Sequence, residues 1–265
     1  MPSEKVLDFQ KRKIFYKTYG EGPAVVLIHG VPVDNDIWRN QVNELKGFKF
    51  IVPDLPGSGA SEMIEDMSME GMAEVIKAIL DEGKIATASL IGHSIGGYIS
   101  LAFAEKYPGY LKGFGLFHST AYPDSEDRKI IRKKAIEVIE KNGAFEFLKT
   151  SIPNLFSPEN REKTVVIIEE LIGKANNFSS PSLVSYYQAM MKRPGRISVL
   201  KNLEIPVLFI AGKFDTAIPL IDSLKQSHLP EKAYFHILSG SGHMGMMEEA
   251  EKTNAVLNDY LINLS

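Results

Sequence analysis

The sequence of 265 residues contains no cysteine, which excludes disulfide bonds, thiol nucleophiles and cysteine-based zinc or iron–sulfur sites. It has no apolar stretch approaching the roughly 18 residues of a membrane span, and residues 1–8 lack the apolar segment of a signal peptide. The formal net charge is only −3, without long runs of like charge, so neither nucleic acid nor an anionic membrane is an expected partner. We therefore expect a cytoplasmic protein, in which any covalent catalysis uses a residue other than cysteine.

Short apolar runs alternate with helical patterns along most of the chain. Residues 13–19 and the turn at 20–23 predict a hairpin that leads into a buried strand at 24–28. Further strands are predicted at residues 48–52, 86–91, 111–117, 207–211 and 234–238. Apolar residues at three and four spacing predict helices at residues 37–45, 69–82, 95–106, 220–228 and 246–264. This alternation is typical of an α/β fold, with a mostly parallel central sheet covered by helices on both faces.

The alternation is interrupted between the strands predicted at residues 111–117 and 207–211, where no strand pattern occurs. Helices are predicted there at residues 126–141, 144–149, 158–174 and 182–191. We interpret residues 119–200 as a helical cap inserted between two strands of a core formed by residues 1–118 and 201–265.

A serine motif follows the strand predicted at residues 86–91. The segment Gly92-His93-Ser94-Ile95-Gly96 lies between that strand and the helix predicted from Ile95. A serine on a sharp strand-to-helix turn, flanked by glycines that allow close backbone approach, is the nucleophile elbow of acyl-transfer enzymes. The pattern therefore predicts Ser94 as a nucleophile.

A serine hydroxyl is a weak nucleophile, so a histidine base and an acid that orients it are expected downstream. His243 is the best candidate for the base, because it ends a loop of small residues between the last predicted strand and the last helix. Strand ends are where open parallel sheets form their active sites. His228 falls in a predicted helix and His236 in a predicted strand, which favours solvated and core positions for them.

Asp215 is the candidate for the orienting acid. It lies between the strand predicted at residues 207–211 and the next helix, which places it at the same sheet edge as Ser94 and His243. Asp222 is the nearest competitor, but its position within a predicted helix favours a solvated role.

Acyl transfer also needs donors for the oxyanion, usually two backbone N–H groups. The first would be that of Ile95, directly after the nucleophile. The second would be that of Val31, in the loop after the strand at residues 24–28, because the following Pro32 has no N–H.

With these residues in place, the sequence resembles the α/β-hydrolase superfamily over essentially its whole length. Four motifs occur in the family's order: His29-Gly30 after a strand, residues 54–61 after the next, the elbow at Ser94, and the loops of Asp215 and His243. The sequence looks most like the lid-bearing esterase, lactonase and cofactor-free haloperoxidase group. The resemblance implies a structural role for residues 54–61. It disfavours haloalkane dehalogenase and epoxide hydrolase activity, because those enzymes carry aspartate where this chain has Ser94.

A cap over the strand ends would exclude water and shape a pocket, so residues near it are candidates for substrate binding. Each candidate also has a structural alternative, such as ordering a loop, fastening a helix to the sheet or packing the cap against itself. The candidates are His29, Trp38, His118, Tyr122 and Met190.

The function that we predict is hydrolysis of a small, mostly apolar carboxylic ester through an acyl-enzyme on Ser94. A lactonase, a perhydrolase or a carbon–carbon bond hydrolase would use the same residues, and a small-molecule sensor with little turnover is the alternative from another class. The glycine-rich turns lack phosphate-binding spacing, and neither a metal nor another cofactor is expected. Basic clusters at residues 128–129, 132–134 and 192–193 are interpreted as solvated helix faces. The sequence makes no prediction about oligomeric state.

Overall fold

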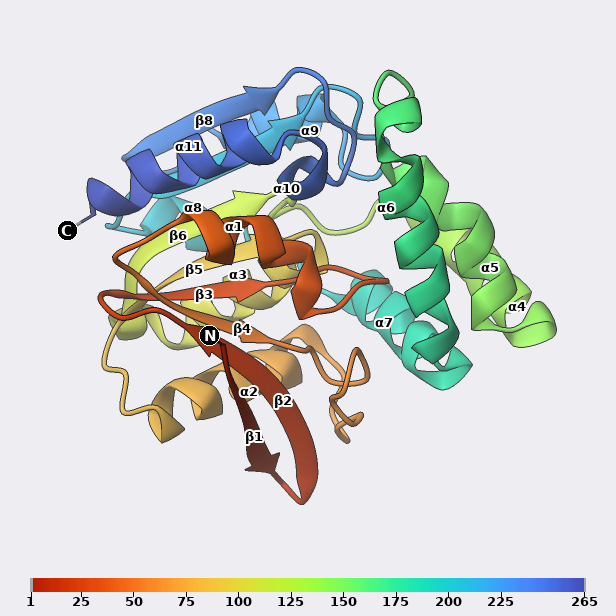
Figure 1. Cartoon of the computed structure of the whole chain (residues 1–265), viewed down its shortest axis with the longest axis horizontal. Helices are drawn as coiled ribbons and strands as arrows, with labels where there is room; N and C mark the ends of the chain where they lie inside the picture. Colours follow the sequence, from red (N-terminus) through yellow and green to blue (C-terminus); the bar gives the residue numbers. More distant parts are fainter. Residues whose placement is uncertain (1, 265) are drawn as a thin grey trace.

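A computed structural model describes residues 2–264 as an eight-stranded sheet flanked by helices, with a group of further helices at one end (Figure 1). The strands are β1 (Ser3–Phe9), β2 (Arg12–Tyr19), β3 (Ala24–Ile28), β4 (Lys49–Pro53), β5 (Ala88–His93), β6 (Leu111–Phe117), β7 (Val207–Gly212) and β8 (Ala233–Leu238). Their order in the sheet is β1-β2-β4-β3-β5-β6-β7-β8. All pairs from β4 to β8 are parallel, which confirms the predicted α/β class.

The N-terminal hairpin differs from the prediction. β2 pairs with β1 and, on its other side, with β4, so it has no hydrogen-bonded contact with β3. Gln10 and Lys11 form the turn between β1 and β2, and their φ angles of 54° and 64° are ones that glycine or asparagine usually supplies. Because neither residue type stands there, the sequence contains no turn signal at this point, and the predicted pairing of residues 13–19 with 24–28 was wrong.

Two sets of helices cover the faces of the sheet. α2 (Met69–Glu82), α3 (Ile95–Lys106) and α8 (Ile197–Asn202) pack on one face. The other face is covered by α1 (Arg39–Glu44), α10 (Gly245–Glu248) and α11 (Ala250–Ile262). A further helix, α9 (Leu220–Gln226), follows β7 in the chain. The bounds of α2 agree with the prediction. The helix begins after Ser68, whose hydroxyl caps it by accepting a hydrogen bond from the N–H of Gly71 at 3.0 Å.

Four helices between β6 and β7 form the layer at the end of the sheet (Figure 1). They are α4 (Glu126–Asn142), α5 (Ala144–Ser151), α6 (Arg161–Lys174) and α7 (Ser180–Lys192). We refer to this layer as the cap. The proposed cap boundary at residue 200 falls within α8, a helix that was not predicted and that packs against α3 of the core. Within residues 2–264, no helix has both the length and the apolar character that crossing a membrane requires.

The two ends of the cap segment are joined to each other at its base. The N–H of Arg196 donates to the carbonyl oxygen of Ala121 at 2.8 Å, and the Arg193 Nη2 donates to the carbonyl oxygen of Tyr122 at 3.1 Å. The chain therefore leaves and re-enters the core at one place.

α7 is fixed to the loop that follows β4. The Tyr186 hydroxyl donates to the carbonyl oxygen of Pro56 at 2.6 Å, and the Ser182 hydroxyl donates to that of Gly57 at 2.6 Å. Tyr186 is fully buried. These bonds agree with the structural role that the resemblance implied for residues 54–61.

Candidate active site

Ser94 lies at the sharp turn between β5 and α3. Its φ of 53° and ψ of −119° are strained for a residue with a side chain. The turn needs its glycines: a Cβ added to Gly96 would lie 2.7 Å from the carbonyl oxygen of His29, which is too close for two non-bonded atoms. The strand, turn and helix thus have the geometry that the motif predicts.

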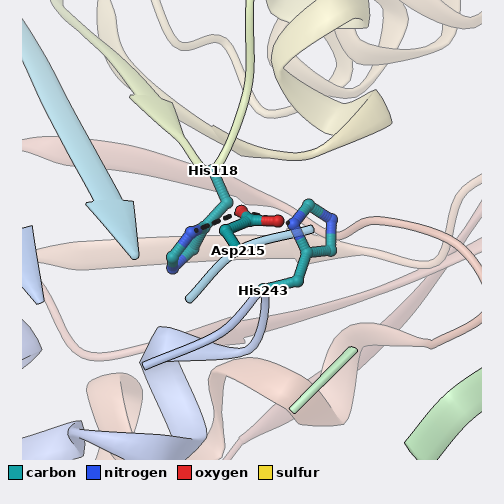
Figure 2. A group of neighbouring side chains, drawn as sticks. All are labelled: His118, Asp215 and His243. Carbon is teal, nitrogen blue, oxygen red and sulfur yellow. Dashed lines mark hydrogen bonds and ion pairs between the residues drawn. The ribbon is translucent and has the colours of Figure 1, made fainter. Parts of the chain in front are cut away.

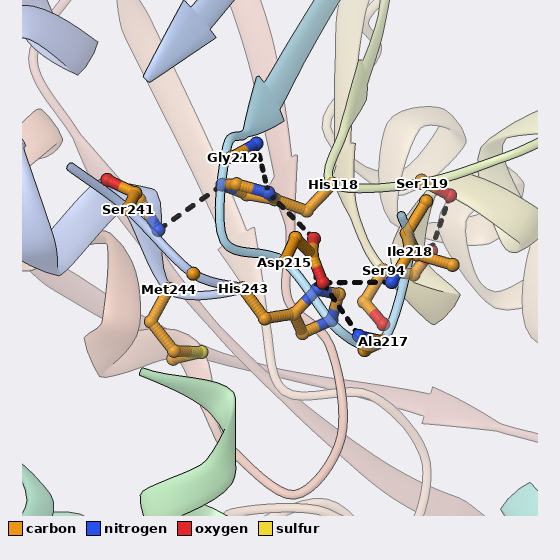
Figure 3. A network of polar contacts seen from close by, with 12 residues as sticks. Ser94, His118, Ser119, Gly212, Asp215, Ala217, Ile218, Ser241, His243 and Met244 are labelled. Atoms are coloured by element: carbon orange, nitrogen blue, oxygen red, sulfur yellow. Dashed lines mark hydrogen bonds and ion pairs between the residues drawn. The ribbon is translucent and has the colours of Figure 1, made fainter. Parts of the chain in front are cut away.

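Asp215 lies between two imidazole rings (Figure 2). Its Oδ2 is 2.8 Å from the Nδ1 of His243 and 3.0 Å from the Nδ1 of His118. Its Oδ1 accepts from the N–H groups of Ala217 at 2.9 Å and Ile218 at 2.8 Å (Figure 3). Asp215 and both histidines are buried, so these four groups fix the position of the carboxylate.

The electrostatics of this group favour an ionised Asp215. Burial alone would raise the pKa of its carboxyl group, but the charge of His243 and the hydrogen bonds from both rings outweigh burial and hold that pKa well below its ordinary value. Burial lowers the pKa of His118, which its contact with Asp215 only partly opposes. His118 is therefore neutral at pH 7, and one of its nitrogens carries the only ring proton.

The contacts of His118 indicate which nitrogen carries that proton. The N–H of Gly245 lies 3.3 Å from Nε2, so Nε2 accepts and Nδ1 donates to Asp215. The N–H of Gly212 lies 3.2 Å from Nδ1, but a protonated Nδ1 cannot accept from it. We assign the proton by the shorter contact, which is the one to Asp215. The ligand atoms of His118, Asp215 and His243 lie within 4.8 Å of one another, as metal ligands would, and these hydrogen bonds account for that spacing.

Ser94 and His243 line the same cavity of about 570 Å³ beneath the cap. Among residues 2–264, the Ser94 hydroxyl and the His243 ring form no hydrogen bond with each other, and such bonds commonly tighten only when a substrate is present. Val31 and Ile95 also line the cavity, and neither N–H is paired with an acceptor within the described chain. The predicted nucleophile, base and oxyanion donors thus meet in one place.

Of the five candidate substrate-binding residues, Met190 alone lines this cavity. Trp38 is fully buried with its ring edge-on to Phe117 at 5.5 Å, so it packs a helix onto the sheet. His29 is fully buried, and its Nε2 accepts a hydrogen bond from the N–H of Leu55 at 2.9 Å. His29 therefore orders a loop, which was the structural alternative to substrate binding.

Tyr122 and His118 also lie away from the cavity lining. The Tyr122 hydroxyl donates to the carbonyl oxygen of Lys225 at 3.4 Å. His118 was a candidate for substrate binding with a structural alternative, and the structure favours the alternative: its backbone, with a φ of 48°, directs the ring toward Asp215.

The interpretation of the basic clusters as solvated helix faces was wrong for two arginines. The side chains of Arg132 and Arg193 are 15% and 3% exposed, and both form ion pairs with Asp124. Arg128, Arg132 and Lys134 of α4 line the cavity. The helical spacing of Arg128, Arg132 and Ala135 could have indicated that one face of α4 is turned inward.

Glu248 of α10, which sequence reasoning missed, holds the His243 loop against the cap. Its Oε1 accepts from the N–H groups of Gly242 at 2.9 Å and Met244 at 3.1 Å, and its Oε2 accepts from that of Ser157 at 2.7 Å. Burial raises the pKa of Glu248 to about 7, although these three donors oppose the rise.

This raised pKa predicts that the Glu248 contribution to stability depends on pH. The folded state binds the proton more tightly than the unfolded state. The contribution of Glu248 to the free energy of unfolding is therefore fully present below pH 4.5 and is lost as the pH rises through about 7. The loss is at most about 3 kcal/mol. Urea unfolding of wild type and Glu248→Gln at pH 5 and pH 8 measures it. The variant should lose that part of the pH dependence, and an equal dependence in both proteins would contradict the prediction.

Comparison with known proteins agrees with the fold. The family model for the alpha/beta hydrolase fold matches residues 23–132. A 2-hydroxy-6-oxo-6-phenylhexa-2,4-dienoate hydrolase from Comamonas testosteroni is 27% identical over 98% of this chain and 94% of its own length. A 3-oxoadipate enol-lactonase from Acinetobacter baylyi is 24% identical over 90% of this chain and 88% of its own.

Solved structures give the same result. A thermophilic esterase from Thermogutta terrifontis, determined with malate bound, superimposes with a TM-score of 0.91 and 27% identity, covering 100% of this chain and 99% of that one. The chain therefore has the α/β-hydrolase fold, as its sequence motifs predicted, and the relatives that it resembles are α/β hydrolases.

Proposed function

We propose that this protein is a serine hydrolase that cleaves carboxylic esters through an acyl-enzyme on Ser94. The observation that carries the proposal is that Ser94, on a strained strand-to-helix turn, and His243, held by Asp215, line one cavity. The Nδ1–H of His243 donates to Asp215, which leaves Nε2 free to act as a base.

The proposed reaction has two halves. The Ser94 oxygen attacks the ester carbonyl while its proton moves to Nε2 of His243, and the N–H groups of Val31 and Ile95 stabilise the oxyanion. His243 then returns the proton to the departing alcohol, which leaves the acyl group on Ser94. A water molecule, deprotonated by His243, attacks the acyl-enzyme and releases the acid. Asp215 stays ionised and stabilises the imidazolium formed in each half.

Two features favour an ester over other bonds. The cavity wall is mostly apolar, with Leu148, Leu183 and Met190 among its residues, which suits an uncharged acyl chain near the serine. The Thermogutta terrifontis relative is described as an esterase. The enol-lactonase and dienoate hydrolase relatives make lactone and carbon–carbon bond hydrolysis the alternatives, because the same three residues serve all three reactions.

Steady-state hydrolysis of p-nitrophenyl esters of increasing acyl length tests the proposal. We expect repeated turnover, with an optimum in length that reflects the cavity of about 570 Å³, and inactivation by a fluorophosphonate that labels Ser94 stoichiometrically. A single turnover, or none, with the fold intact would instead favour a specialised hydrolase or a small-molecule sensor. Labelling at a serine other than Ser94 would contradict the assignment.

His118 is expected to act as a positioning residue for Asp215. His118→Phe keeps a ring but removes the donor to the carboxylate, and we expect kcat to fall about tenfold with KM unchanged, since His118 lies outside the cavity lining. His118→Asn, whose amide can replace the Nδ1 donor, should recover part of the loss. Rates normalised to fluorophosphonate-labelled sites separate this effect from misfolding. Equal rates in the Phe and Asn variants would contradict the positioning role.

A further inference from the structure

One wall of the cavity that contains Ser94 is positively charged. α4 contributes Arg128, Arg132 and Lys134 to the lining, beside the apolar side chains of Ile131 and Val138. Within the described chain, residues 2–264, no lining residue is acidic. This wall therefore has no negative charge of its own facing the substrate space.

Buried charges behind the wall do not neutralise it. Asp124, only 1% exposed at its side chain, binds Arg132 through Oδ2 at 2.5 Å and Arg193 through Oδ1 at 2.8 Å. One carboxylate is thus shared by two guanidinium groups, which leaves one net positive charge. Arg193 lies outside the cavity lining, and its Nη groups donate to Asp124, Met190 and Tyr122. The remaining charge is available at Arg132.

The guanidinium of Arg132 is held in position, but only part of its hydrogen-bonding capacity is satisfied within residues 2–264. Its Nε donates to Asp124, whereas its two Nη nitrogens have no hydrogen-bond partner among residues 2–264. The guanidinium lies 5.6 Å from the ring centre of Tyr187, a residue of the cavity lining. A cation fixed by a buried ion pair and an aromatic ring, with two free donors, is preorganised for an anion because little further ordering is needed on binding.

We propose that this cavity binds esters that carry a second, free carboxylate, and that Arg132 binds this carboxylate through its Nη donors. A single planar guanidinium fork matches a carboxylate, and the apolar side chains of the same cavity lining suit the hydrocarbon spacer of a dicarboxylic acid half-ester. Arg128 and Lys134, at the same wall, attract the anion toward the cavity. The inference rests on the proposed ester hydrolase function and names its substrate class.

A pair of substrates that differ only in charge tests this inference. Monomethyl adipate and its carboxamide analogue, methyl 6-amino-6-oxohexanoate, have the same length and nearly the same shape. We expect wild type to favour the carboxylate by about tenfold or more in kcat/KM. Arg132→Gln, which can still donate to Asp124, should lower this ratio about tenfold. Arg161→Gln, at an exposed arginine of α6 outside the cavity lining, should leave the ratio unchanged.

The outcomes separate the inference from the function on which it rests. If p-nitrophenyl esters are hydrolysed but wild type does not prefer the carboxylate, the inference fails and the esterase proposal stands. If no ester is hydrolysed by wild type, the proposed function fails. Inhibition of p-nitrophenyl butyrate hydrolysis by succinate, glutarate, adipate and suberate, each against its monoamide, covers other spacer lengths and needs no variant. Equal inhibition by acid and amide at every length would overturn the inference.

Discussion

Replacing Ser94 with alanine is expected to reduce kcat for p-nitrophenyl ester hydrolysis by about 10⁴-fold or more. The variant loses the oxygen that would form the acyl-enzyme, and no cysteine is present to replace it. The N–H groups of Val31 and Ile95 remain, so a small residual rate above the uncatalysed reaction is expected. Steady-state kinetics on both proteins, with circular dichroism to verify folding, gives the comparison.

Ser227→Ala provides a matched control for this variant. Ser227 is half-buried after α9, and among residues 2–264 its hydroxyl donates only to the carbonyl oxygen of Leu224 at 2.9 Å. The control should retain wild-type kinetics. If Ser94→Ala keeps more than about a tenth of the wild-type kcat, the activity does not proceed through an acyl group on this serine.

Replacing Asp215 with asparagine should lower kcat by about 10³- to 10⁴-fold. The carboxylate accepts from two rings and two backbone N–H groups, and an amide can accept only through its oxygen. The amide N–H₂ would then face a ring nitrogen and favour the wrong tautomer of His243, with the proton on Nε2, where the base must be free.

Asp222→Asn is the control for this second variant, because Asp222 was the competing candidate for the acid. Asp222 lies in α9, and its carboxylate forms only a long ion pair of 3.8 Å with Lys225. Because no other partner of this carboxylate occurs among residues 2–264, we expect Asp222→Asn to behave as wild type in kcat and KM. A large loss in Asp222→Asn together with a small loss in Asp215→Asn would reverse the assignment.

The sequence alone predicted the elements whose signals are local. The start of α3 follows from the elbow motif, and the bounds of α2 follow from a helical apolar pattern. Ser94, Asp215 and His243 were predicted to lie at one sheet edge because each is in a loop or turn after a parallel strand, and the structure brings them together there.

The parts that the sequence did not predict depend on three-dimensional packing. β4 inserts between β2 and β3, a non-local pairing that no short pattern encodes. The direction of a side chain is also absent from the sequence, so it could not decide between pocket and structural roles for Trp38 and His118, which are both buried outside the cavity lining. The inward face of α4 was not predicted for another reason. Its basic residues are typical of a solvated helix, and the inward position of Arg132 depends on its ion pair with the buried Asp124.

The hydrogen bond that joins the two ends of the cap segment affects how this segment can be replaced during evolution or by design. Ala121 and Arg196 are bonded through their backbones, so the bond does not depend on which side chains these positions carry. The segment between them can therefore be exchanged for another of different length and composition while the strand register of the core is preserved. We expect a chimera joined at these two positions to keep the reacting groups in place and to acquire the substrate range of the donor segment, which makes the cap a replaceable module for selecting substrates.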